Sequence, residues 1–231
     1  MGTKPRLHMG KTDPKTIGTV ITILAKQITH YDNPVVTEIA EQTKQDPFKV
    51  LISCLISLRT KDEVTVKASA RLFKLAATSQ KMVKLSEKQI RDAIYPAGFY
   101  ITKAKRIKEI CQTLITEYGG KVPLQFDALM ALKGVGRKTA NIVMVYGHGK
   151  SEYIPVDTHC HRIPNRLGWV KTKTPEETEA ALVKIIPKRY WMPFNNTFVA
   201  FGQNICVPIS PKCSVCPVEK YCKKIGVTVH R

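Results

Sequence analysis

Apolar residues recur at helical spacing along almost the whole of this 231-residue chain. Val20, Ile21, Leu24 and Ile28 are spaced so that they lie on one face of a helix. A second stripe ends at Gly119-Gly120, a helix stop, and consists of Ile107, Ile110, Cys111, Leu114 and Ile115. No clear run alternates apolar and polar residues as a half-exposed strand does. We therefore predict an all-α protein with about ten helices, most of them short.

Two helix starts are marked by capping residues. Ser86 followed by Gln89 is typical of a capping box, in which each residue binds the backbone of the other. Thr174 followed by Glu177 has the same spacing, and Pro175 suits the first helical position. We predict that helices begin at both places.

The first residues differ from the rest of the chain. Residues 1–16 are polar and basic and contain Pro5 and Pro14, so we expect a flexible tail without a secretory signal. The longest uncharged apolar run, Val50 to Leu58, is too short to span a membrane. We expect an intracellular protein with no membrane partner: in the cytoplasm or nucleoid of a prokaryote, or in the nucleus or an organelle of a eukaryote.

The charge of the chain is strongly one-sided. Its 37 Lys and Arg residues against 18 Asp and Glu give a formal net charge of +19. Self-repulsion of that size disfavours a compact state, and a polyanionic partner is the usual reason for it. A basic solvated surface without a partner is the alternative. No segment combines charge and an apolar face as a membrane-binding helix does.

Residues 127–147 predict a helical hairpin that binds an anion. An apolar helix, Asp127 to Leu132, precedes Lys-Gly-Val-Gly, and a second helix begins near Arg137. Two glycines let the backbone turn tightly, and the second helix opens with unpaired N–H groups. With Lys133, Arg137 and Lys138 nearby, a DNA phosphate is the expected anion, and an ordinary turn is the alternative.

The segment Leu-Lys-Gly-Val-Gly-Arg-Lys-Thr-Ala, residues 132–140, resembles the helix-hairpin-helix signature of the endonuclease III family. Val156-Asp157-Thr158-His159 resembles the second half of that signature. The resemblance runs from about residue 17 to residue 222. It implies a base-excision repair enzyme that removes damaged bases, with oxidised pyrimidines as the expected lesions, and then cleaves the strand at the abasic site.

By this resemblance, Lys138 is the nucleophile and Asp157 is its carboxylate partner. The amine would attack the sugar C1′ of a flipped-out nucleotide, and the resulting Schiff base would permit β-elimination. An ordinary lysine amine is protonated at neutral pH, so Asp157 is expected to accept its proton or to stabilise positive charge on the sugar. Without the resemblance, Lys138 reads as a phosphate contact and Asp157 as the N-cap of the next helix. The cap role can coexist with catalysis.

The resemblance also implies loops that fill the gap left by a flipped base. Ser57 to Asp62 matches one of them, and Asp62 is expected to cap the next helix or fix the loop. Many relatives have glutamine where this chain has Arg59, although arginine can also donate hydrogen bonds to an unpaired base. Phe99 matches a second, wedge-like loop, with core packing as the alternative. The residues predicted to contact DNA are Arg59, Thr60, Lys61, Asp62, Phe99, Lys133, Gly134, Val135, Gly136, Arg137, Thr139, His159 and Arg162.

Four of the seven cysteines lie close together near the C-terminus, as Cys206, Cys213, Cys216 and Cys222. Their C-x6-C-x2-C-x5-C spacing alone suits either structural zinc or an iron–sulfur cluster. It is similar to the spacing that endonuclease III relatives use for a [4Fe–4S] cluster, which we therefore expect. For the scattered cysteines, we expect small buried thiols, at Cys54, Cys111 and Cys160.

The resemblance implies two helical domains with a DNA cleft between them. We expect one bundle over residues 40–151, with the hairpin, and a second domain from residues 17–39 and 152–231, with the cluster loop. Double-stranded DNA with damaged bases or abasic sites is the expected partner, and we expect a monomer. The alternatives are an adenine or mismatched-thymine glycosylase that does not cut the strand, and a non-catalytic DNA-binding protein. Lys138 argues against the first, and the retention of Lys138 with Asp157 argues against the second.

Overall fold

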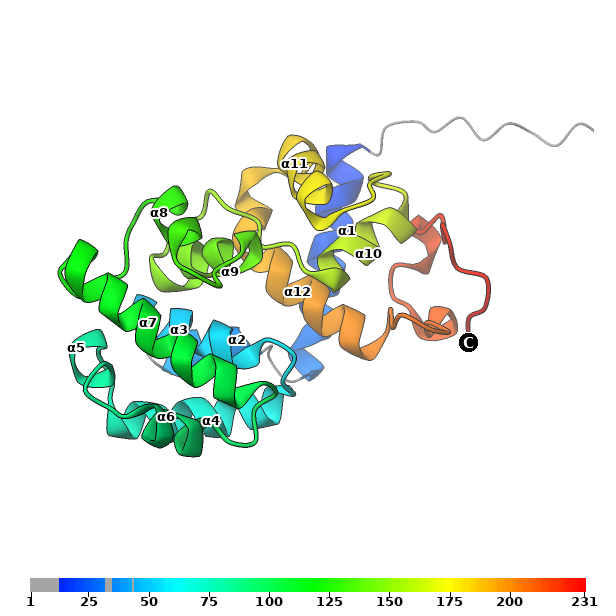
Figure 1. Cartoon of the computed structure of the whole chain (residues 1–231). Coiled ribbons are helices and arrows are strands. Elements are labelled where there is room, and N and C mark those ends of the chain that lie inside the picture. The colour runs from blue at the N-terminus through cyan, green and yellow to red at the C-terminus, as the bar shows by residue number, and fades with distance from the viewer. Residues whose placement is uncertain (1–12, 32–34, 43) are drawn as a thin grey trace, which may run out of the picture.

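The computed structural model describes residues 13–31, 35–42 and 44–231, and all regular elements in these residues are helical (Figure 1). The predicted all-α fold is therefore confirmed. No helix in the described ranges has both the length and the apolar character needed to cross a membrane. The helices are α1 (Pro14–Gln27), α2 (Val35–Gln42), α3 (Pro47–Ser57), α4 (Asp62–Leu75), α5 (Ser79–Met82), α6 (Glu87–Ile94), α7 (Tyr100–Tyr118), α8 (Phe126–Ala131), α9 (Arg137–Ile142), α10 (Thr158–Leu167), α11 (Pro175–Ile185) and α12 (Trp191–Asn204). Short turns of other helical types are η1 (Ile28–His30), η2 (Val143–Gly147, a π-helical turn), η3 (Lys188–Tyr190), η4 (Cys213–Val215) and η5 (Glu219–Tyr221).

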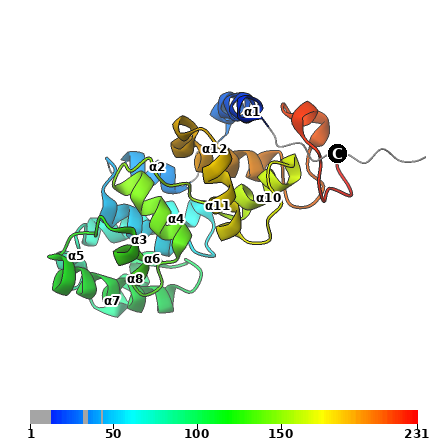
Figure 2. The ribbon, with the colours of Figure 1, turned by 90° about the horizontal axis from the view of Figure 1, so that it is seen from above.

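The helices form two lobes, each around its own hydrophobic cluster (Figures 1 and 2). The first lobe runs from α2 to η2, with Leu51, Ile52 and Ile107 fully buried in its centre. The second lobe combines α1 with α10, α11, α12 and the C-terminal loop, around Phe194 and Phe198. Seen from above, the lobes lie side by side, and α1 packs with α12 at the far side from α7 (Figure 2). The domain boundaries predicted from the sequence stay a prediction.

Helix α1 begins earlier than the sequence suggested. Asp13 is its N-cap, with a side-chain oxygen 3.3 Å from the N–H of Thr16, and Pro14 is its first residue. A proline at that position has no N–H to lose and its fixed φ suits a helix. Residues 13–16 therefore belong to α1 and not to a flexible tail; the rest of the predicted tail lies outside the described residues. The buried face of α1 includes Val20, Ile21 and Leu24, as predicted.

The two predicted capping boxes differ in outcome. Ser86 and Gln89 bind each other's backbone N–H groups at 3.1 and 2.8 Å, so the first box is confirmed. At α11, Thr174 accepts from the N–H of Glu177, but the Glu177 carboxylate accepts from Lys173 and not from Thr174. The Glu177 carboxylate thus binds the residue before the N-cap, and the second box is not formed. The helix still begins where the sequence predicted, with Thr174 as its N-cap.

Helix α7 is the longest of the described helices, and it buries the predicted stripe. Ile107, Ile110, Cys111 and Leu114 face the first core, and the helix ends at Gly119 with a φ of +60°. Burial raises the pKa of the Cys111 thiol to about 12, and that of Cys54 likewise to about 12. With Cys160, which is fully buried, these thiols are the small core residues that the sequence predicted.

Ionic and polar contacts join the lobes where they meet. Arg137 of α9 binds the Glu179 carboxylate of α11 through two hydrogen bonds of 2.8 and 2.9 Å. Its guanidinium also lies over the ring of Phe126, 5.2 Å from the centroid. On the other side of the junction, Gln203 of α12 donates to Asp62 of α4 at 3.3 Å. Arg137 therefore bridges the lobes, in addition to any contact that it makes with DNA.

Replacement of Arg137 by methionine is expected to destabilise the protein by about 1.5–3 kcal/mol, because the buried Glu179 carboxylate loses two charged hydrogen bonds. The matched control is Lys133→Met on the same hairpin; the Lys133 side chain is 72% exposed, and its ammonium lies 3.8 Å from the Glu109 carboxylate. That control should lose no more than about 1 kcal/mol, as exposed ion pairs do. Urea unfolding of both variants measures the difference. Equal losses would show that the Arg137–Glu179 pair does not hold the lobes together.

Candidate active site and nucleic-acid interface

The predicted hairpin is present, with α8 and α9 joined by residues 132–136. Gly134 adopts a φ of +86°, and the side chain of Arg106 packs 3.1 Å from where its Cβ would lie. Gly136 is the N-cap of α9 and supplies no side-chain acceptor, so no side chain caps the first N–H groups of the helix. Val135 and Thr139 are buried, so any contact that they make with DNA runs through their backbone.

Lys138 and Asp157 come together where the lobes meet. The Nζ atom of Lys138, on α9, lies 3.8 Å from Oδ2 of Asp157, which precedes α10. The lysine is 47% exposed and the aspartate 11% exposed, so solvent reaches the pair from the lysine side. Both residues line a surface pocket together with Arg137, Val156, Thr158, His159, Pro175, Glu176 and Glu179.

Asp157 is held by bonds that leave one of its carboxylate oxygens available. Its Oδ1 accepts hydrogen bonds from the N–H groups of His159 and Cys160, at 2.9 and 2.8 Å. The expected N-cap role is therefore observed, and it does not compete with Lys138, which faces Oδ2. The segment before it is fixed too, because Asn195 of α12 donates to the carbonyl of Pro155 at 2.9 Å. The carboxylate thus has a set position relative to α9.

The two predicted phosphate contacts on α10 are bound inside the protein. Arg162 donates to Nδ1 of His159 at 3.1 Å, and also to the carbonyls of Gly202 and Cys206, at 3.2 and 2.8 Å. Burial lowers the pKa of both side chains; this favours the neutral form of His159, whereas the Arg162 guanidinium remains charged. His161 faces away from this group and binds the hydroxyl of Thr178 at 2.6 Å. Arg162 thus links α10 to the cysteine loop before it meets any DNA.

The two predicted gap-filling loops lie against each other. Arg59 and Phe99 both adopt the left-handed conformation, with φ of +52° and +58°. The guanidinium of Arg59 lies over the Phe99 ring, 5.5 Å from its centroid. Phe99 is 62% exposed, so core packing does not explain it.

The start of α4 differs from the prediction for Asp62. Lys61 is the N-cap by position and makes no side-chain capping bond, whereas Asp62 is the first helical residue and binds Gln203. Asp62 therefore does not cap the helix but contacts the other lobe. The hydroxyl of Thr60 bridges both loops, as it accepts from the N–H of Gly98 at 3.1 Å.

Lys103, on α7, binds the first of these loops, and no role was predicted for it from the sequence. Its ammonium donates to the carbonyls of Ile56 and Leu58 and to the Thr60 hydroxyl, at 2.6, 2.6 and 2.8 Å. The sequence did contain a signal for it, because Lys103 falls on the apolar stripe of α7, four residues before Ile107. A lysine in that register buries the apolar part of its side chain, and its ammonium then needs polar partners at the edge of the core.

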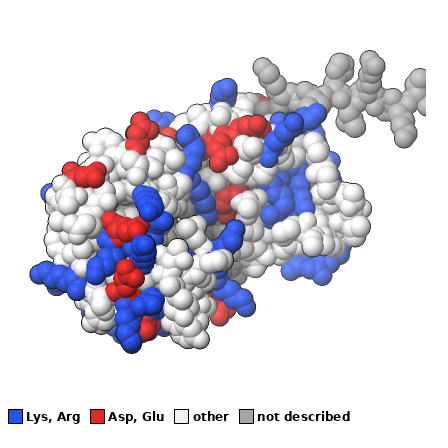
Figure 3. All heavy atoms as spheres, in the orientation of Figure 1, with Lys and Arg blue, Asp and Glu red and all other residues white. Residues whose placement is uncertain are grey.

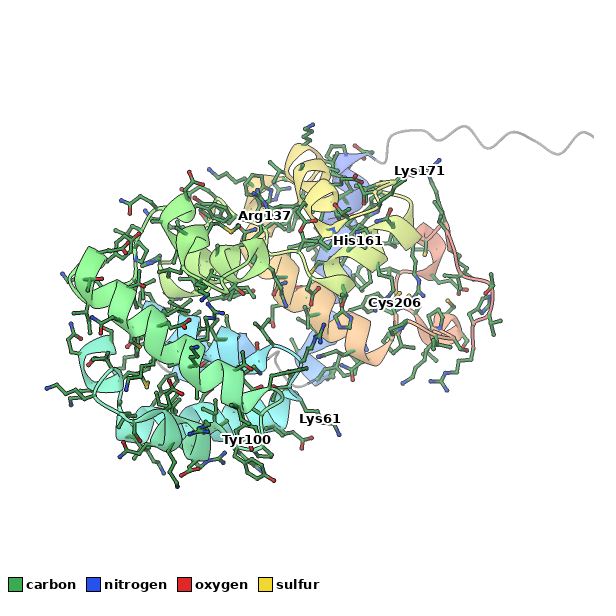
Figure 4. All side chains as sticks on the ribbon, in the orientation of Figure 1. Lys61, Tyr100, Arg137, His161, Lys171 and Cys206 are labelled. Atoms are coloured by element: carbon green, nitrogen blue, oxygen red, sulfur yellow. The ribbon has the colours of Figure 1, made fainter. Side chains whose placement is uncertain are left out.

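The four C-terminal cysteines line one cavity in the second lobe, with Arg166, Leu167 and Phe201 among the other lining residues. Cys206 lies just past the end of α12 (Figure 4). Among the described residues, no group of three or more His, Cys, Asp or Glu is close enough together to hold a metal ion. Burial raises the pKa of the Cys216 thiol to about 11.

The surroundings of the cavity suit sulfur ligands that carry negative charge. The guanidinium of Arg166 lies 3.4 Å from the Cys206 sulfur, and the N–H of Lys224 donates to the Cys222 sulfur at 3.3 Å. Arg166 also donates to the carbonyls of Val207 and Pro208, at 2.7 and 2.6 Å, which fixes the loop after Cys206. Four soft donors around one cavity, with N–H donors directed at two of the sulfurs, are compatible with a thiolate-bound cluster.

The sequence profile of the HhH-GPD superfamily, described as base excision DNA repair proteins, matches residues 52–188. The match includes the hairpin, Lys138 and Asp157, and it ends before the four C-terminal cysteines.

Comparison with individual proteins gives the same family. Endonuclease III of Thermotoga maritima is 50% identical over 178 residues, which cover 77% of this chain and 83% of that protein. A solved structure of a trapped covalent intermediate of endonuclease III with DNA superposes with a TM-score of 0.78 at 31% identity, over 91% of this chain and 96% of that one. A thermostable thymine-DNA glycosylase superposes with a TM-score of 0.78 at 25% identity, again over 91% and 96% of the two chains. By its profile match, its identity and its coverage, this chain belongs to the endonuclease III family of the HhH-GPD superfamily of base excision DNA repair proteins.

Proposed function

We propose that this chain excises damaged bases, with oxidised pyrimidines as its lesions, from double-stranded DNA and then cleaves the strand at the resulting abasic site. The observation that carries the proposal is the approach of Lys138 to Asp157, at 3.8 Å, across the junction of the lobes. The likeness to a trapped covalent endonuclease III–DNA intermediate supports it, because such an adduct needs a nucleophile on the protein.

The chemistry begins at the sugar of a nucleotide turned out of the helix. The neutral amine of Lys138 attacks C1′; the N–C1′ bond forms while the glycosidic bond breaks, and the base leaves with the electron pair and takes up a proton. Opening of the sugar ring at O4′ gives the imine. The imine acidifies the hydrogens on C2′, and loss of one of them expels the 3′ phosphate oxygen from C3′. Water then hydrolyses the imine and releases the lysine.

Asp157 is positioned to assist these reaction steps. Its Oδ2 faces the ammonium of Lys138, so it can take up the proton that the amine has to lose before attack. If the lysine proton goes to solvent instead, the carboxylate stays ionised, and its negative charge near the nucleophile would stabilise the positive charge that grows on the sugar as the base leaves. Oδ1 stays bound to the start of α10 and keeps the side chain oriented.

Binding of duplex DNA is supported by charge and by shape. Lys and Arg side chains are spread over both lobes on the face seen in Figure 3, and they are more numerous there than Asp and Glu. The hairpin offers Lys133 and the first N–H groups of α9 to a phosphate. Arg59 and Phe99 project from the first lobe, where they can fill the gap in the stack.

The likeness to a thymine-DNA glycosylase supports a second candidate function. In this alternative the chain is a glycosylase in which water attacks the sugar and the strand stays uncut. The amine of Lys138 beside Asp157 favours the covalent route, since a water-based mechanism has no use for a lysine in this place.

The four C-terminal cysteines, Cys206, Cys213, Cys216 and Cys222, are proposed to hold a [4Fe–4S] cluster. The cluster would supply structural cross-linking and no step of the base excision. Arg166 and the N–H of Lys224 would bind two of its thiolates. The loop held in this way carries Lys212, Lys220 and Lys223, and we propose that these cations contact the DNA backbone.

Lys138→Gln is expected to abolish covalent trapping. The protein is mixed with duplex DNA that carries thymine glycol or an abasic site, borohydride is added, and the adduct is resolved by gel electrophoresis. Wild type should give an adduct, because borohydride reduces the imine, and the variant should give none while it still binds DNA. Lys133→Gln, on the same hairpin, should still be trapped. An intact wild type that binds DNA but gives no adduct would contradict the lyase function and leave either the water-based glycosylase or a non-catalytic DNA-binding protein.

Asp157→Asn separates the cap from the chemistry. Asparagine caps a helix as well as aspartate does, so the melting temperature should change little. Single-turnover base excision should slow by about 10²–10⁴-fold, because the carboxylate can no longer accept a proton or oppose the charge on the sugar. Asp127→Asn on α8 is the control and should excise at the wild-type rate. A variant that excises normally would remove Asp157 from the reaction.

The cluster is tested on protein purified without air. Wild type should be brown, with iron and acid-labile sulfide in equal amounts, as a [4Fe–4S] cluster requires. Cys216→Ser should lose the colour and both elements, whereas Cys111→Ser, in the first core, should keep them. Colourless wild-type protein that contains zinc would assign the cysteines to a zinc site.

A further inference from the structure

The proposed chemistry gives no role to Lys103, although it is the most fully bonded lysine near the interface. Only 8% of it is exposed. Its Nζ lies within 2.6–2.8 Å of three acceptors, the carbonyls of Ile56 and Leu58 and the hydroxyl of Thr60. An ammonium has three N–H groups, so all its donors are used.

The position of this charge is set by the C-terminal end of α3. Ile56 lies in the last turn of α3 and Leu58 follows it, so their carbonyls are among those that an α-helix leaves without partners. A cation at a helix C-terminus is favoured by the helix dipole. Burial lowers the pKa of Lys103 to about 8, so the ammonium predominates at neutral pH and can use all its donors.

Thr60 carries the contact on to the second loop. Its hydroxyl accepts from Lys103 at 2.8 Å and from the N–H of Gly98 at 3.1 Å, and donates to the carbonyl of Leu58 at 3.3 Å. The loops are so close that a Cβ on Gly98 would lie 2.4 Å from the carbonyl oxygen of Arg59. The guanidinium of Arg71, on α4, donates to the carbonyls of Ala93 and Tyr95 and so fixes the chain just before the loop that carries Phe99.

This network of hydrogen bonds positions two side chains that extend from the first lobe, Arg59 and Phe99. Arg59 and Phe99 flank the bonded residues Thr60 and Gly98, and both have a left-handed backbone. With Leu58, Lys103, Arg106 and Gly134 they line one groove that reaches the hairpin. In Figure 4, Lys61 and Tyr100, which follow the two loops in the chain, lie at the lower part of the first lobe.

We propose that Lys103 is a positioning residue that locks Arg59 and Phe99 into one gap-filling unit, through which the chain distinguishes the base opposite the lesion. The proposal rests on the proposed function in one respect, namely that the chain binds DNA at a damaged base. Lys103 touches no substrate; it acts on the contact with the unpaired base through the carbonyls before Arg59 and through Thr60.

The variant Lys103→Met keeps the length of the side chain and removes all its donors. Single-turnover excision of the same lesion is measured opposite each of the four bases. The fastest of these rates should fall by about tenfold to a hundredfold, as for a misplaced group near the reaction. The differences between the four opposite bases should shrink as well, which a general loss of stability does not produce. Lys105→Met on the exposed face of α7 is the matched control and should keep both.

Two further variants show whether the effect runs through the proposed contacts. Thr60→Val removes the hydroxyl and should reproduce the loss of selectivity, whereas Thr60→Ser retains it and should restore wild-type behaviour. Once Arg59→Ala has removed the guanidinium, Lys103→Met should cause little additional loss of opposite-base selectivity. Additive losses in the double variant would mean that Lys103 does not act through Arg59.

A binding measurement keeps this inference separate from the catalytic one. DNA with 2-aminopurine opposite a stable abasic analogue changes fluorescence when a side chain enters the gap, and no bond is broken. At saturating protein, wild type and Lys105→Met should give the full change and Lys103→Met a reduced one. An unreduced change together with wild-type selectivity would overturn the positioning role of Lys103. A full wild-type change without borohydride trapping would instead overturn the lyase function and leave the positioning role standing.

Discussion

The carboxylate of Asp157 lies where the two lobes meet, and each of its oxygens has a different partner. Oδ1 is bound by the first N–H groups of α10, whereas Oδ2 faces Lys138 of the other lobe. Because the cap fixes the side chain, the approach of the lysine depends on how α10 packs in the second lobe. Asn195 holds the segment before Asp157, and the Arg137–Glu179 pair holds α9 against α11. The geometry of the candidate active site therefore depends on how the two lobes pack against each other.

The cations of the chain fall into two groups, those that are exposed to solvent and those that are bound inside the protein. Exposed lysines such as Lys133 are available to phosphates. Several other cations are bound internally: Lys103 binds the end of α3, Arg162 the end of α12, and Arg166 the loop after Cys206. In each case a cation satisfies backbone carbonyls that have no helical partner, which a neutral side chain could do less completely. A net charge of +19 therefore overstates the number of cations that are free to meet DNA.

The sequence predicted those features that local patterns determine. Helical spacing, the Ser86–Gln89 box and the glycines of the hairpin each depend on a few neighbouring residues, and the structure agrees with them. The family resemblance brought Lys138 and Asp157 together although 19 positions separate them in the sequence. Other contacts between the lobes were not predicted. Arg137 with Glu179 and Asp62 with Gln203 join different lobes, and no local pattern specifies such partners. Pro14 falls within the predicted tail, but with Asp13 as the cap it is the first residue of α1.

The path of the chain between the lobes affects how the protein is made. Helix α1 ends at Gln27, but α12, against which it packs, begins only at Trp191. On the ribosome, the whole first lobe is synthesised between these two helices, and it is continuous in sequence from α2 to η2. The first lobe can therefore assemble while the apolar face of α1, with Val20, Ile21 and Leu24, still lacks its native cover. During that interval, the apolar face of α1 is exposed unless a chaperone or a temporary partner covers it.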